Sequence, residues 1–325
     1  MSGTLLEAPT DFNTFDLTEW LELTMVIDEV DLISRASILS FFPAGQGPDS
    51  AELDQLFAEV RRRASSAPAI YPFVDQGDEI LFDRSIDSRA YLALLVMSID
   101  SAPYRVEDRF NEINPDFELL TREAMTAYAG PGAKGLRFGW PNDDGRPQYL
   151  GDAVEWLANR LGLAVGVVHD EVDSTDKDGG IDVVAWKPFM DGSPSFSVWL
   201  VQCTVQATYE RKPADVVPEK WVAWIRFGRQ PEIVLSVPQA IPLDAKIRDD
   251  LKYRANVVLD RIRLCELLNN VSDLSQHEEW AHLLDWTNAE ILMTRAALSA
   301  SGGAAPRRQK IRRPLRPRKA SEPLV

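Results

Sequence analysis

The sequence predicts an α/β protein whose α/β core, about one hundred residues long, lies between helical N-terminal and C-terminal regions. Three observations support this. Apolar residues recur at helical spacing through much of the first 140 residues. Short apolar, strand-like segments then follow one helical segment up to residue 242. Helical spacing returns from residue 243.

Composition narrows the class of protein. The chain has 325 residues, of which 45% are hydrophobic and 26% are charged, as in ordinary folded domains. No apolar run approaches the ~18–20 residues that span a bilayer. Residues 1–11 also lack the basic and apolar segments of a secretory signal. We therefore expect a soluble, cytoplasmic protein that does not bind membranes.

Cysteine and histidine are too scarce for most zinc sites. The chain has 2 Cys and 3 His, whereas thiolate and imidazole sites usually need four such ligands, or three beside a water. A bound metal would have to be held by oxygen ligands, which favours Mg²⁺ or a similar hard cation such as Mn²⁺.

Charge is distributed unevenly. The net charge is −15, but residues 301–325 contain eight Arg or Lys and one Glu, so residues 1–300 carry −22. An acidic body is unsuited to general nucleic-acid binding. The basic, proline-containing tail is the one strongly cationic segment, and we expect it to be disordered alone.

The N-terminal region, residues 1–140, is predicted to be mainly helical and to offer a surface for a protein partner. Helical spacing covers Leu17 to Met25 and Ser50 to Arg63, and Ser50 is a plausible N-cap. Further helices are expected over 87–99 and 114–128, the second with Asn114 as its cap.

The predicted core spans 141–242 and begins after a glycine-rich segment and a punctuated loop. It starts with an amphipathic helix over 152–161, ended by Gly162. Four strands are expected, over 164–168, 181–186, 197–205 and 232–237. The C-terminal region, 243–300, is expected to form two helices over 243–269 and 276–299.

One strand pair carries the candidate chemistry. Asp182 follows Gly179 and Gly180 at the start of an apolar strand, where glycines permit close approach of backbone or ligand. On the partner strand, Gln202 and Thr204 share one face because side chains alternate. In a suitable register Asp182 lies beside Gln202. By default Asp182 caps a turn, and Gln202 bonds to neighbouring backbone.

These residues belong to a wider pattern of motifs. Arg137-Phe138-Gly139-Trp140-Pro141 precedes a helix, Asp178 to Trp186 reads Asp-Gly-Gly-Ile-Asp-Val-Val-Ala-Trp, and Gln202-Cys203 is followed by Tyr209 and Lys212. The pattern resembles the restriction-endonuclease-like PD-(D/E)XK nucleases, nearest their Mrr-like branch. It is also similar to largely uncharacterised bacterial proteins of defence loci. The resemblance covers roughly residues 135–270.

The resemblance implies a mixed sheet flanked by helices and a metal-dependent site. Asp182 matches the metal-bridging aspartate, and Gln202 takes the place of the second-strand acid. The helix acid is Asp152 or Glu155, which lie one turn apart. Thr204 stands where the family has a lysine, so Lys212 is the candidate substitute. The implied chemistry is Mg²⁺-assisted phosphodiester hydrolysis.

Other conspicuous residues have plainer interpretations. Trp221 and Trp224 could stack on bases, but aromatic residues at helical spacing are more often core. Cys203 alternates away from Gln202 and is expected in the core. The acidic segment 169–180 does not match an EF-hand and is expected to be a solvated loop.

The function predicted from the resemblance is a Mg²⁺-dependent DNA endonuclease, the effector of a bacterial anti-phage or mobile-element defence system. A protein partner encoded nearby, such as an ATPase or sensor subunit, and a homo-oligomer are part of this expectation. The competing hypothesis is a catalytically inactive nuclease fold that serves as a nucleic-acid-binding or scaffold subunit; a third is a restriction enzyme acting on modified DNA. Phosphate contacts from the tail are assigned to Arg307, Arg308, Lys310, Arg312 and Arg313.

Overall fold

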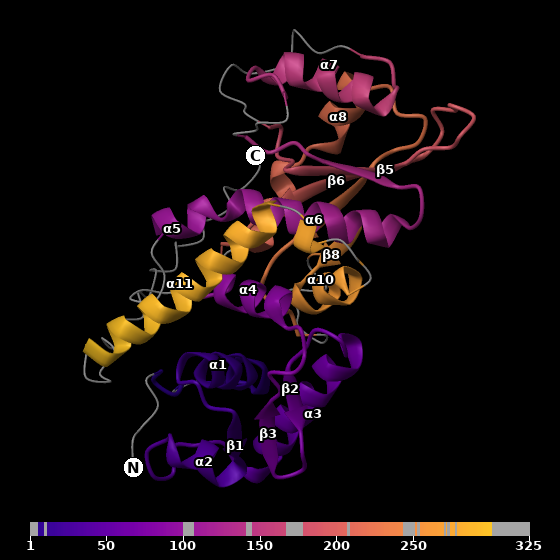
Figure 1. Cartoon of the computed structure of the whole chain (residues 1–325). Helices are drawn as coiled ribbons and strands as arrows, with labels where there is room; N and C mark the ends of the chain where they lie inside the picture. The colour runs from indigo at the N-terminus through magenta and orange to yellow at the C-terminus, as the bar shows by residue number, and fades with distance from the viewer. Residues whose placement is uncertain are drawn as a thin grey trace, which may run out of the picture.

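The structure is a computed structural model that describes residues 6–9, 12–99, 107–140, 145–166, 178–206, 209–242, 251, 254–269, 271, 274–276 and 278–300. It is a mixed α/β protein with a five-stranded mixed sheet and a small antiparallel sheet (Figure 1). None of the helices in these ranges is long and apolar enough to cross a membrane.

The N-terminal unit combines helices with the small sheet. Its elements are listed in chain order: α1 (Thr14–Ile27), β1 (Leu32–Ser34), α2 (Arg35–Ser40), α3 (Ser50–Ser66), β2 (Phe73–Asp75), β3 (Glu79–Phe82) and α4 (Arg89–Met97). The predicted helices are confirmed. The sheet, in the order β1-β3-β2, was not predicted, because strands of three or four residues are too short to show alternation.

The predicted cap of α3 is wrong by one residue. Asp49 is the N-cap: its side chain accepts from Glu52 N at 2.8 Å, and Glu52 Oε2 accepts from Asp49 N at 2.8 Å. This capping box satisfies two amide donors at the helix start, which leaves Ser50 as the first helical residue. Ile113, not Asn114, likewise occupies the N-cap position of the helix that begins at Asn114.

The larger sheet has the order β4-β5-β6-β7-β8. Strand β5 runs antiparallel to both neighbours, whereas β6, β7 and β8 are parallel. The remaining elements through this sheet are listed in chain order: α5 (Glu107–Glu112), α6 (Asn114–Ala129), β4 (Lys134–Arg137), α7 (Leu150–Leu161), β5 (Val183–Lys187), β6 (Ser197–Cys203), η1 (Tyr209–Asp215), α8 (Pro218–Trp224), β7 (Glu232–Ser236) and β8 (Val257–Leu259).

Helices cover both faces of this sheet (Figure 1). Alternate residues of β5 and β6 face opposite layers: Val184 and Leu200 pack in one apolar cluster with α7 and α8, and Val183 and Val201 pack in another that includes α6. The sheet edge where β5 begins and β6 ends therefore lies between helices from both layers.

Two predicted segments differ in the structure. The glycine-rich segment before residue 141 contains β4, so the first strand of the sheet and α6 precede the predicted start of the core. The expected helix over 243–269 is wrong: it contains β8 and the shorter helix α10 (Arg261–Leu268), while 243–250 lie outside the described residues. Three β-branched or apolar residues favour a strand, and Asp260 caps α10 by accepting from Arg263 N at 3.1 Å.

The chain then forms η2 (Leu274–Gln276) and the predicted long helix α11 (Glu278–Ala300). Of the expected strand 164–168, Val165 forms a single bridge to Ile225, and residues 167–168 are outside the described part.

A buried network, here called the junction network, joins the N-terminal unit to α10. Arg63 Nη1 donates to Glu22 Oε1 at 2.9 Å and to Glu19 Oε1 at 2.5 Å, and Arg261 Nη2 donates to Glu19 Oε2 at 2.7 Å. Both arginines are fully buried. Because a buried charge is tolerated only with partners, these pairs fix the position of α10 against α1 and α3.

Candidate functional site

Asp182 and Gln202 lie side by side at the edge where β5 begins and β6 ends. Val183 pairs with Val201, and Asp182 N donates to Val201 O at 2.8 Å. Gln202 Nε2 donates to Asp182 Oδ2 at 3.1 Å, and Cys203 N donates to the same oxygen at 2.7 Å. The register expected from the sequence thus brings these two predicted site residues together.

The pair leaves two acceptor oxygens unused. Gln202 Oε1 is buried and has no hydrogen-bond partner, although a buried carbonyl normally has one. Asp182 Oδ2 has two donors, and in the described part of the chain Asp182 Oδ1 receives none. An unsatisfied carbonyl beside a carboxylate with a free oxygen is an arrangement that a hard cation would complete.

The segment after β4 holds Asp182 from the other side. Phe138 N and Gly139 N both donate to Asp182 O, at 2.6 and 2.9 Å. The preceding residue, Arg137, donates from Nε to Glu118 Oε2 at 2.5 Å. The Arg-Phe-Gly part of the motif therefore connects Asp182 on β5 to an acid on α6.

Glu118 is the acid that the sequence reasoning missed. It lies on α6, is 7% exposed, and packs so closely on Gly139 that a Cβ there would lie 2.5 Å from Glu118 Oε2. Its negative charge acts on Asp182. The signal available in the sequence was one acid within the apolar face of a helix that precedes the first strand.

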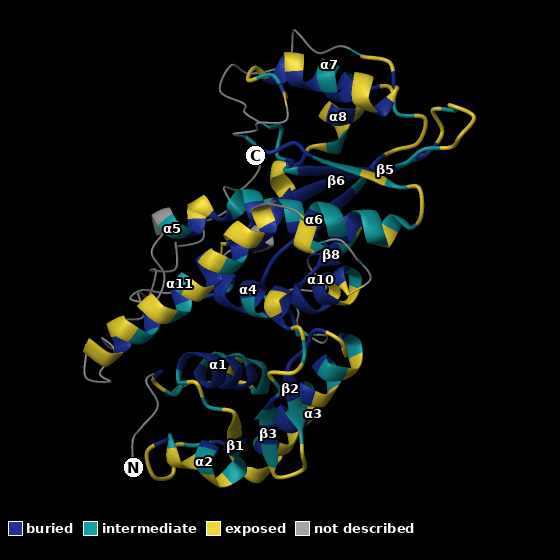
Figure 2. Cartoon of the chain, viewed as in Figure 1, coloured by how far each residue is buried: buried dark blue, intermediate teal, exposed yellow. Residues whose placement is uncertain are grey.

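The predicted helix acids lie elsewhere. Asp152 is exposed and Glu155 half-buried on α7, which covers the opposite face of the sheet from α6 (Figure 2). Neither is among the groups that dominate the electrostatics of Asp182. The structure thus brings Glu118 to the Asp182–Gln202 pair.

The two carboxylates share an environment that disfavours their charge. Burial raises the pKa of Glu118 to about 7; Arg137 opposes this rise and Asp178 adds to it. Burial, followed by the charge of Glu118, raises the pKa of Asp182 well above its usual value, while Lys212 lowers it. Carboxylates pushed toward the neutral form are typical of sites that await a positive partner.

Glycines bring the segment that carries Lys212 against the start of β5. Gly180 has φ +84°, and a Cβ there would lie 2.4 Å from Asp215 O; Gly179 has φ +61° and packs on the Trp221 ring. The close approach expected at these glycines is thus made by backbone of η1 and by α8. Lys212 is partly exposed, with Nζ 3.5 Å from Asp215 Oδ2, and acts on Asp182 through its charge.

Thr204 is buried and structural. Its N–H donates to Ser236 O at 3.1 Å, and its Oγ1 accepts from Gln206 N at 3.2 Å. A hydroxyl in this role supplies no positive charge, so Lys212 and the arginines are the cations near the site.

Arg146 brings a second guanidinium to this region. It is buried, lies 4.3 Å above the Phe138 ring and 5.8 Å from the Trp140 ring, and donates to Pro147 O at 3.0 Å. Its charge interacts with Asp178, whose Oδ1 accepts from Gly180 N at 2.9 Å.

The plainer interpretations hold for several conspicuous residues. Trp221 and Trp224 are fully buried and pack against each other, which confirms that they are core. Burial, with the charge of Asp182, raises the pKa of the Cys203 thiol well above its usual value, as suits a core residue. The acidic loop 169–177 and the tail residues Arg307, Arg308, Lys310, Arg312 and Arg313 lie outside the described residues.

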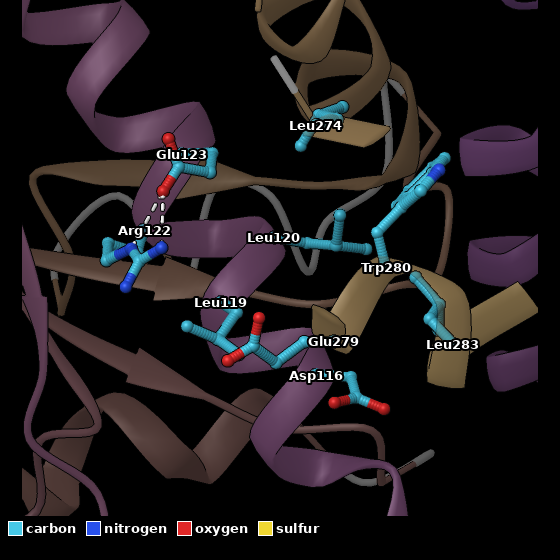
Figure 3. Close-up of a pocket in the computed structure, with 9 residues that line it drawn as sticks. All are labelled: Asp116, Leu119, Leu120, Arg122, Glu123, Leu274, Glu279, Trp280 and Leu283. Atoms are coloured by element: carbon cyan, nitrogen blue, oxygen red, sulfur yellow. Dashed lines mark hydrogen bonds and ion pairs between the residues drawn. The ribbon is translucent and has the colours of Figure 1, made fainter. Parts of the chain in front are cut away.

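A separate small pocket lies between α6 and α11 (Figure 3). Leu120, Leu274, Trp280 and Leu283 form its apolar part. Asp116 at its rim accepts from or donates to His282 Nδ1 at 2.5 Å. Glu118 does not line this pocket, so the pocket is distinct from the Asp182 site.

The site was tested for its fit to a metal. In the described ranges no group of three or more His, Cys, Asp or Glu side chains is placed to hold an ion. Mg²⁺, however, needs only one or two carboxylates, because it keeps waters or substrate oxygens as its other ligands. Asp182 and the unsatisfied Gln202 Oε1 fit this requirement with oxygen donors, and Glu118 is the nearest further acid in charge and position.

Comparisons with known proteins do not add to this description. No family model matches the chain, and neither the curated proteins nor the solved structures contain a significant match.

Proposed function

We propose that this chain is a Mg²⁺-dependent phosphodiester hydrolase that cleaves DNA. The observation that carries the proposal is the buried, unsatisfied Oε1 of Gln202 beside Asp182 at one sheet edge. A buried polar atom without a partner is costly, and a hard cation would satisfy it.

Each residue has a defined role in this proposal. Asp182 and Gln202 would hold Mg²⁺ (or Mn²⁺), which when bound lowers the pKa of a water and neutralises charge on the reacting phosphate. Glu118 would orient the water or complete the ligand set, and Arg137 keeps Glu118 in place. Lys212 would stabilise the negative charge that develops on the phosphate.

Two further observations agree with the resemblance to the PD-(D/E)XK nucleases. The mixed sheet has helices on both faces, and a buried acid on a helix reaches the strand pair that carries Asp182 and Gln202. The preference for DNA, the role as a defence effector and the nearby-encoded partner come from the resemblance.

A second candidate function is a catalytically inactive nuclease fold that serves as a binding or scaffold subunit. Thr204 at the expected lysine position favours it, because its side chain is used by the backbone. The two candidates predict opposite results in one assay.

The experiment is cleavage of plasmid and single-stranded DNA by the purified chain with Mg²⁺ or Mn²⁺. Asp182→Ala should lower the rate by ~10²–10³ if the residue acts as an electrostatic stabiliser. Lys212→Ala tests the replacement lysine: cutting that survives this change removes Lys212 from the mechanism.

The matched control is Asp191→Ala, an exposed carboxylate in the β5–β6 turn, which should cut like the wild type. If no form cuts DNA, and Asp182→Ala leaves DNA binding unchanged, the scaffold function replaces the enzyme.

A further inference from the structure

The N-terminal unit has the arrangement of a winged helix-turn-helix. The order α1, β1, α2, α3, β2, β3 places two consecutive helices before a β-hairpin, and β1 pairs with β3 to close a three-stranded sheet. In helix-turn-helix proteins the second of these helices is the one that contacts the partner. This topology identifies the unit as a module for interaction.

Its charge argues against nucleic acid as the partner. Residues 12–99 contain fifteen Asp or Glu, six Arg and no Lys. The arginines of α2 and α3 are engaged with carboxylates: Arg35 with Asp54, Arg61 with Asp75, and Arg63 within the junction network. A duplex is bound through cations that neutralise phosphates, and this unit does not offer them.

The small sheet presents an apolar row on its outer side. Leu32 pairs with Leu81, and Leu81 pairs with Val74, so these side chains form one row across three strands. Their neighbours Ile33, Ile80 and Phe73 face the core. Leu32 is 44% exposed, and of the described elements only α2 makes substantial contact with β1 from outside the sheet.

Carboxylates border this row. Glu79 is on the same side of β3 as Leu81, the preceding Asp78 is almost fully exposed, and Asp31 directly precedes β1. An apolar row with an acidic border matches a segment in which basic residues alternate with a few apolar ones. We call the surface of Leu32, Val74, Asp78, Glu79 and Leu81 the wing face.

The chain itself contains such a segment, and it starts close by. Arg295 of α11 donates from Nε to Ile27 O at 2.6 Å, and its Nη1 lies 2.8 Å from Glu29 Oε1. The end of α11 is therefore beside the connection from α1 to β1 (Figure 1). Residues 301–306 can extend about 20 Å at ~3.3–3.6 Å per residue, enough to carry residue 307 to the wing face.

We propose that the basic tail, residues 307–319, docks on the wing face of its own chain. Its cationic side chains pair with Asp31, Asp78 and Glu79, and Ile311 and Leu315 cover the apolar row. The docked tail is withheld from nucleic-acid phosphates until a competing partner displaces it. The proposal is independent of the nuclease function.

The test is zero-length carbodiimide cross-linking of the full chain, which joins lysine amines to carboxylates in contact. Lys310 and Lys319 are the lysines of the tail. We expect intramolecular links from them to Asp31, Asp78 or Glu79. These links should weaken strongly in high salt, because exposed charges are screened, and disappear in Asp78→Lys/Glu79→Lys.

The control is Asp191→Lys/Glu219→Lys, which changes the net charge equally at exposed positions of the other half and should leave the links unchanged. Trypsin should remove the tail several-fold faster from the wing-face variant than from the control. Links spread evenly over other carboxylates, or equal trypsin rates, would overturn the proposal. Links that join two chains would also overturn it, because they assign the face to the tail of a second copy.

Discussion

Arginines and carboxylates are buried together in two regions of this molecule, and the balance of charge differs between them. In the junction network Glu19 and Glu22 face Arg63 and Arg261, and Tyr71 and Tyr91 also donate to Glu22, at 2.7 and 2.5 Å. One nitrogen, Arg63 Nη2, has no partner, but every buried carboxylate contacts a cation.

At the Asp182 site the acids outnumber the cations in contact. Arg137 pairs with Glu118, and Asp182 accepts hydrogen bonds only from an amide side chain and a backbone N–H of the described chain. A balanced network stabilises a junction, whereas an excess of buried carboxylate next to an unsatisfied carbonyl is suited to bind a cation. The comparison separates a structural cluster from a functional one.

The largest effect is expected from breaking the balanced network. Arg63→Met leaves Glu19 and Glu22 buried with one guanidinium, which should lower the free energy of unfolding by about 3–5 kcal/mol. Arg62→Met is the matched control, because Arg62 is partly exposed and pairs with Glu59 alone; it should cost about 0–1 kcal/mol. Denaturant unfolding measures both, and equal losses would show that the network adds nothing to the junction.

The second effect sharpens the identity of the helix acid. Glu118→Gln should reduce DNA cleavage by ~10²–10³, because it removes a charge next to the reacting centre. Asp152→Asn and Glu155→Gln should cut at the wild-type rate. Initial rates with Mg²⁺ decide between the helices: a loss in either α7 variant, with Glu118→Gln active, would restore the acid expected from the sequence.

The third effect is a pH dependence of stability in the absence of metal. A carboxyl whose folded pKa is raised binds its proton more tightly when folded, so its ionisation destabilises the fold as pH rises. With a pKa of about 7 for Glu118, the loss develops between about pH 4.5 and pH 7 and reaches on the order of 3 kcal/mol. Unfolding in EDTA across this range should show Glu118→Gln gaining on the wild type; a constant difference would remove the strained carboxylate.

Sequence reasoning located one half of the site and missed the other for a physical reason. Asp182 and Gln202 could be placed together because side chains alternate along a strand and the pair is joined by a short hairpin. Glu118 meets them only through packing of α6 on the sheet, and that packing depends on β4, a four-residue strand in a glycine-rich segment. With β4 unrecognised, α7 became the nearest helix and its acids were chosen.

The fold shows the same division between local and non-local information. The longer helices α1, α3, α6 and α11 follow from apolar spacing. Strand β8 was hidden within a helix-like pattern, because its three residues gain their partners only from β7. Short strands depend on long-range pairing, which local periodicity does not report.

The most direct test of the central claim is equilibrium unfolding of the metal-free chain with and without Mg²⁺. A cation that binds only the folded state stabilises it by RT ln(1 + [L]/Kd), about 1.4 kcal/mol at ten times Kd. The wild type should gain stability as Mg²⁺ is added, and Asp182→Asn should gain none. A wild type indifferent to Mg²⁺, or an equal gain in both proteins, would contradict a cation site at Asp182 and Gln202.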